Sequence, residues 1–146
     1  MNKEQLLLKE IEIIQSEIAR FDSNGLTIKE WCVGVWAGLI AFGFSEKQPV
    51  IFFAAIATTL SFAFVEFTYR RFQGRFIDRS EVLENLLESE NLQSYTYRIH
   101  RIAVKNSGFI LESIRVAKMG QFTVFYLMLV ALAALAACYS RHLTVV

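Results

Sequence analysis

The charged residues of this chain are confined to a few segments, and the stretches between them are long and apolar. Apart from the pair Glu46 and Lys47, charges fall before residue 31, between residues 66 and 118, and at Arg141. An α-helix needs about 20 apolar residues to cross a hydrocarbon layer of about 30 Å. The hydrophobic fraction of 54% also exceeds the roughly 45–50% that is usual in soluble domains. We therefore expect an all-α integral membrane protein.

Residues 1–25 are expected to form a cytoplasmic amphipathic helix that ends in a turn. Apolar residues recur here at alternating spacings of four and three, as in a heptad seam, and charged residues stand opposite. Three arrangements are open: oligomerisation with other copies, packing against the protein's own helices, or lying flat on the membrane. The acidic polar face disfavours the last. The oligomerisation seam consists of Leu7, Ile11, Ile14, Ile18 and Phe21.

A transmembrane hairpin is expected over residues 26–69. The run from Phe21 to Gly25 has turn composition, and Thr27 and Glu30 have the spacing of a capping box that begins a new helix. The two predicted spans, 26–44 and 49–69, are joined by a short polar connection, and Pro49 suits the first turn of the second helix.

Residues 70–118 are expected to form a cytoplasmic helical region, because arginines follow the second span directly and Lys/Arg-rich ends lie in the cytoplasm. The second span is predicted to continue into this region as one long helix. A third transmembrane span follows over 119–139, and residues 140–146 form an extracytoplasmic tail. The N-terminus is then cytoplasmic. No removable signal peptide is visible at the start of the chain.

Glu66 is the one ionisable residue well inside an apolar run. A carboxylate in a bilayer is costly and usually faces a partner or water. Glu66 can pair with Arg70 one turn later, as Glu followed by Arg at this spacing is favourable. It can also line a pore or a gate formed by several copies.

Small residues in the spans allow helix backbones to approach closely. The contacts could form between copies or among the three helices of one chain. The predicted helix-packing residues are Gly34, Gly38, Ala133 and Ala137.

Basic and aromatic residues occur together in the cytoplasmic region. Arginine offers forked donors to phosphate and tyrosine offers a stacking face, so a phosphate-bearing ligand is one interpretation. Contact with anionic lipid headgroups is the other. The residues concerned are Tyr95, Tyr97, Arg98, Arg101 and Lys105.

The sequence contains no Gly-rich phosphate loop, paired histidine ligands or nucleophile elbow, so we expect no enzyme, no cofactor and no metal site. The net charge of +1 creates no general basic field, so direct nucleic-acid binding is not expected. Cys32 and Cys138 lie near predicted opposite membrane faces and should not pair. Membrane lipids are the expected partners.

The segments 21–31, 69–72 and 76–79 together resemble small bacterial proteins with a two-helix membrane hairpin and a cytoplasmic helical extension, including the SLATT-type group. This resemblance implies a membrane-disrupting effector in anti-phage or nucleotide-signalling systems. A cytoplasmic protein or a nucleotide signal is a further candidate partner. The leading hypothesis is an oligomeric effector of the bacterial inner membrane that forms a pore or perturbs the bilayer. The alternative is a non-conducting anchor or assembly subunit that recruits a cytoplasmic partner.

Overall fold

The computed structural model describes residues 3–88, 95, 113–114, 116 and 120–145. Three long helices account for most of them: α1 (Lys3–Glu46), α2 (Pro49–Glu88) and α5 (Gly120–Val145). No strand occurs among the described residues, so the all-α class is confirmed for that part of the chain. Each of the three helices contains a stretch long and apolar enough to cross a membrane.

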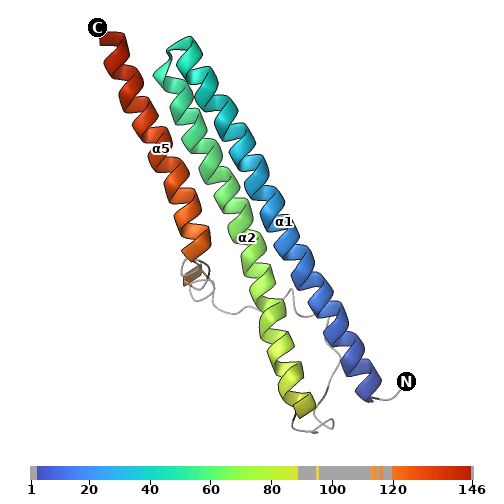
Figure 1. Ribbon diagram of the computed structural model, residues 1–146. Coiled ribbons are helices and arrows are strands. Elements are labelled where there is room, and N and C mark those ends of the chain that lie inside the picture. Colours follow the sequence, from blue (N-terminus) through green and yellow to red (C-terminus); the bar gives the residue numbers. More distant parts are fainter. Residues whose placement is uncertain (1–2, 89–94, 96–112, 115, 117–119, 146) are drawn as a thin grey trace.

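The helices α1 and α2 form an antiparallel hairpin along nearly their whole length, and α5 lies beside α2 over the half that contains the connecting turn (Figure 1). With 44 residues in α1 and 40 in α2, the hairpin is about 60–66 Å long at 1.5 Å per residue. A hydrocarbon layer is about 30 Å thick. The hairpin is therefore about twice as long as one crossing requires.

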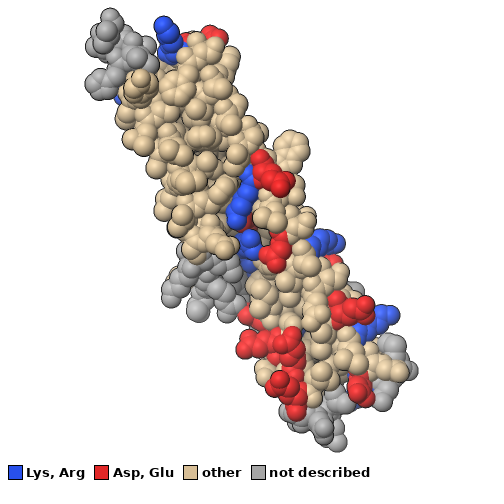
Figure 2. All heavy atoms as spheres, in the orientation of Figure 1, with Lys and Arg blue, Asp and Glu red and all other residues tan. Residues whose placement is uncertain are grey.

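Charge divides the hairpin into two halves. The apolar half comprises residues 26–69 together with α5, and the charged half comprises residues 3–25 and 70–88. Figure 2 shows a surface almost without charged side chains at one end of the molecule, except at the tip, and gathered acidic and basic side chains at the other. The long-helix prediction for the second span is confirmed, because α2 passes from one half to the other without interruption.

The predicted turn at residues 21–25 is wrong, because α1 is continuous from Lys3 to Glu46. Asp22 instead accepts hydrogen bonds from Arg70 and Gln73 on α2. Thr27 does not cap a new helix; its hydroxyl donates to the carbonyl oxygen of Ser23 at 3.2 Å, within the same helix. Contacts with the neighbouring helix therefore outweigh the local turn preference.

Gly25 lies at a close approach of the two helices. A Cβ atom at this position would stand 3.3 Å from Nη2 of Arg70. The glycine that suggested a turn thus makes room for an arginine side chain inside the helical pair.

The predicted short connection between the spans is confirmed, with α1 ending at Glu46 and α2 beginning at Pro49. Lys47 adopts a left-handed backbone conformation with φ 53°, which is a common way to end a helix. Close to the turn, the ring of Phe52 packs directly on Gly43, where a Cβ would come within 2.9 Å of it.

The apolar seam of the N-terminal segment packs against α2 of the same chain. Leu7 and Ile14 are fully buried in a cluster with Leu83 and Tyr95, and further apolar side chains surround it. Phe21 packs edge-on against the Tyr69 ring, with centroids 5.9 Å apart. Of the three arrangements open from the sequence, the structure has the intramolecular one. The partly buried members are Leu6, Ile11, Ile18, Phe76 and Leu86.

A second cluster holds the three helices together in the apolar half. Its buried members are Cys32, Tyr126 and Leu129, which come from α1 and α5. Both cysteines are free thiols; Cys32 is buried here and Cys138 is exposed. The side chains packed around the cluster are Trp36, Phe62, Ala63, Phe122 and Phe125.

Candidate functional site

The carboxylate of Glu66 is the point at which the three helices meet. It is fully buried. Its Oε1 lies 3.3 Å from Nζ of Lys29 on α1 and 3.4 Å from Nε of Arg70 on α2. The hydroxyl of Tyr126 on α5 donates to Oε2 at 2.8 Å. One side chain on α2 thereby contacts both neighbouring helices.

Arg70 links this carboxylate to a second acidic residue. Its Nη1 donates to Oδ1 of Asp22 and to Oε1 of Gln73, each at 2.9 Å. The amide of Gln73 donates to the same Oδ1 of Asp22, also at 2.9 Å. These contacts form a continuous network between α1 and α2. We use the name Glu66 cluster for this network together with two further partners of Glu66, Lys29 and Tyr126.

The Glu66 cluster balances its charges. Lys29 and Arg70 carry two positive charges, and Glu66 and Asp22 carry two negative ones. Removing a charge from water costs several kcal/mol unless a partner and further hydrogen bonds compensate it. The position of the cluster, at the border between the apolar and charged halves, explains why full pairing is needed there.

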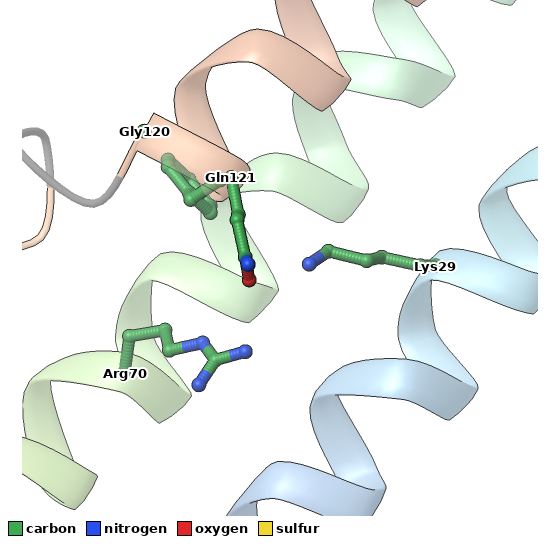
Figure 3. Close-up of a pocket in the computed structure, with 5 residues that line it drawn as sticks. Lys29, Arg70, Gly120 and Gln121 are labelled. Atoms are coloured by element: carbon green, nitrogen blue, oxygen red, sulfur yellow. The ribbon is translucent and has the colours of Figure 1, made fainter.

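A hollow opens beside the Glu66 cluster. It has a volume of ≈ 280 Å³ and is lined by residues from all three helices. Figure 3 shows the ends of Lys29 and Arg70 directed toward the space into which the Gln121 side chain also extends. The lining residues are Lys29, Arg70, Gly120, Gln121 and Phe122.

A second buried carboxylate, Glu10, lies in the charged half. Its Oε1 faces Arg79, with Nε at 3.0 Å and Nη2 at 2.9 Å. The hydroxyl of Tyr95 donates to its Oε2 at 2.7 Å. This arrangement ties α1 to α2 and to a residue that follows α2 in the chain.

The structure pairs Glu66 with Arg70, as the spacing predicted. Sequence reasoning missed the other partners, Lys29 and Tyr126. A signal for them existed, because Lys29 borders an apolar stretch and Tyr126 is a hydroxyl-bearing residue inside one. Their convergence on Glu66 depended on the helix register, which the sequence did not reveal. A pore role for Glu66 stays a prediction.

The four predicted helix-packing residues divide into two pairs. Ala133 and Ala137 are buried on α5. Gly34 and Gly38 are exposed on α1, and a Cβ at either position would meet nothing within 4 Å. The glycines are therefore not in close helix contact within this chain, and contact with another copy stays a prediction.

Tyr95 is buried, and its hydroxyl donates a hydrogen bond to Glu10, the second buried carboxylate. The other four residues of the predicted phosphate or lipid contact, Tyr97, Arg98, Arg101 and Lys105, lie outside the described residues. The structure therefore does not test that prediction.

Comparison with known proteins found no matching family model, no matching curated protein and no matching solved structure.

Proposed function

We propose that this chain is a multi-pass protein of the bacterial inner membrane that self-associates and perturbs the bilayer when its charged half receives a signal. In this proposal the charged half and the N-terminus lie in the cytoplasm, and α5 ends outside. The arginines that follow the second apolar stretch support that orientation, because Lys/Arg-rich ends stay in the cytoplasm.

The observation that carries the proposal is the continuity of α1 and α2 across the border between the halves. A rearrangement of the charged half would be transmitted to the spans because no loop interrupts either helix. At the border, Glu66 joins the hairpin to α5, so a shift of α2 would also act on the third helix.

Self-association is supported by the exposed face of α1 in the apolar half. Gly34 and Gly38 lie one turn apart on this face, and glycines at such spacing let helices from two copies approach closely. A chain with three spans can hardly enclose a channel alone, so several copies would be required around an axis.

Dye release from liposomes tests the proposal. Purified wild-type protein and the variant Glu10→Gln would be reconstituted at several protein-to-lipid ratios. Glu10→Gln weakens the contact with Arg79 and is chosen to imitate a signal in the charged half. We expect the variant to release dye, with a dependence on protein concentration steeper than linear.

The matched variants Gly38→Leu and Ala57→Leu separate self-association from general damage to the spans. Both sites are exposed in the apolar half, one on α1 and one on α2. Gly38→Leu should lower both the oligomer mass in lipid and the dye release, and Ala57→Leu should change neither. No release by wild type or Glu10→Gln, together with a monomeric mass, would contradict the proposal and favour the non-conducting anchor.

A further inference from the structure

The hollow beside the Glu66 cluster presents hydrogen-bond donors from three helices. Lys29 contributes an ammonium group, Arg70 a guanidinium group and Gln121 an amide. Figure 3 shows all three extending into the region between α1, α2 and α5. None of the described residues that line the hollow is acidic.

The acidic partners of the two cations are not among the described residues that line the hollow. Glu66 is fully buried, and its second oxygen accepts a hydrogen bond from the hydroxyl of Tyr126. The side chain of Asp22 is 54% exposed, so water and salt screen its charge. The face turned toward the hollow therefore stays positive although the cluster as a whole is balanced.

Both cations retain donors for a ligand. An ammonium group has three N–H donors, and among the described residues the charged partner of Lys29 is Glu66 alone. An arginine has five N–H donors, and the described hydrogen bonds of Arg70 use Nε and Nη1. No described hydrogen bond uses Nη2, which lies close to Gly25 on α1.

The level of the hollow along the hairpin matches the headgroup layer of a membrane. Lys29 stands just inside the start of the first apolar stretch, and Arg70 directly follows the second. Lipid phosphates lie at the border of the hydrocarbon layer, where basic residues attract them. Phe122 adds an aromatic side chain to the lining, suited to the apolar end of such a ligand.

We propose that this hollow binds a phosphate group, supplied by a phospholipid headgroup or by a soluble phosphate. Its volume of ≈ 280 Å³ lies just below the roughly 300–1,000 Å³ of small-molecule pockets, which suits one headgroup. Lys29 and Arg70 bind the phosphate oxygens through charge-assisted hydrogen bonds, and Gln121 donates a further one. The bound phosphate thereby contacts residues of all three helices.

The variant Gln121→Glu tests this site without removing any partner of Glu66. It places a carboxylate of nearly the same shape in the hollow, where it competes with phosphate for Lys29 and Arg70. Gln121 is exposed, so the variant should fold normally, as checked by its circular dichroism and elution. Gln48→Glu makes the same charge change in the turn at the other end of the hairpin and serves as the matched control.

Binding would be measured by native mass spectrometry of the full chain in detergent, titrated with phosphatidylglycerol. Diacylglycerol with the same acyl chains, which lacks the phosphate, is the lipid control. Wild type and Gln48→Glu should retain phosphatidylglycerol alike and release diacylglycerol. Gln121→Glu should bind phosphatidylglycerol about 10-fold to 100-fold more weakly, as expected for the loss of charge-assisted hydrogen bonds.

A second arm adds inorganic phosphate to lipid-free protein and records the melting temperature by tryptophan fluorescence. If phosphate stabilises wild type but not Gln121→Glu, and phosphatidylglycerol binds both equally, the phosphate site is supported and its ligand is soluble. If Gln121→Glu equals wild type in both arms, the proposal is overturned. Neither arm measures dye release, so this site and the proposed function can fail separately.

Discussion

Glu66 and Glu10 are two fully buried carboxylates in one hairpin, the first in the apolar half and the second in the charged half. Each directs Oε1 to a cation on α2, and each accepts a tyrosine hydroxyl on Oε2. The partners differ in number, because Glu66 has Lys29 as a second cation, whereas Glu10 faces Arg79 in the described part of the chain.

The difference follows from the surroundings. In the charged half, water can reach a carboxylate that loses a partner after a small movement of the helices. Glu66 lies where the apolar half begins, and fewer polar groups there can replace a lost hydrogen bond than in the charged half. We therefore expect the same arrangement to contribute more to stability at Glu66 than at Glu10. Three comparisons of matched variants test this difference.

The largest loss of stability is expected from removing the arginine that pairs with Glu66. Arg70→Met takes one cation from Glu66 and also a donor from Asp22 and Gln73. Breaking a buried pair on one side costs about 3–5 kcal/mol. The matched change Arg79→Met should cost less, because Glu10 can be hydrated. Unfolding in detergent micelles, followed by the fluorescence of the two tryptophans, would give both values. Equal losses would contradict the contrast.

Truncating a buried leucine should lower stability more in the charged half than in the apolar half, the reverse of the order for the arginines. Leu83 belongs to the cluster in the charged half, and Leu129 to the one in the apolar half. Leu83→Ala should cost about 2–5 kcal/mol, as in the cores of soluble proteins. Leu129→Ala should cost less, because lipid chains are as apolar as leucine and only packing is lost. If Leu129→Ala lowered the free energy of unfolding more than Leu83→Ala in the same assay, the apolar half would behave as a core in contact with water.

The smallest effect is expected from deleting one hydroxyl. Tyr126→Phe leaves Oε2 of Glu66 without its donor, and Tyr95→Phe does the same to Glu10. Leaving a buried acceptor unsatisfied costs about 1–3 kcal/mol. Tyr126→Phe should lie at the upper end of this range and Tyr95→Phe at the lower end, as measured by melting temperature in detergent. The reverse order would show that water reaches Glu66.

The helices and their apolar stretches were predictable from the sequence to a large extent. The position of the hairpin turn and the continuation of the second span into the charged half were both found. The continuity of α1 through residues 21–25 was not predicted, because Asp22 and Gly25 have turn preferences that contacts with Arg70 overcome. Local preference amounts to less than about 1 kcal/mol per residue, and the hydrogen bonds of Asp22 with Arg70 and Gln73, together with the packing of α1 on α2, outweigh it.

The candidate site was predicted only in its local part. The pairing of Glu66 with Arg70 follows from their separation by one helical turn. Lys29 and Tyr126 are far from Glu66 in the chain, and no spacing rule connects residues on different helices.

Helix content and the preference of each stretch for an apolar or aqueous environment are readable along the chain, because span length and apolar content are properties of neighbouring residues. The meeting of Lys29, Glu66 and Tyr126 depended on how three helices pack side by side. The register of the hairpin is set by close packing such as that of the Phe52 ring on the backbone of Gly43, and these contacts exist only after the helices have come together.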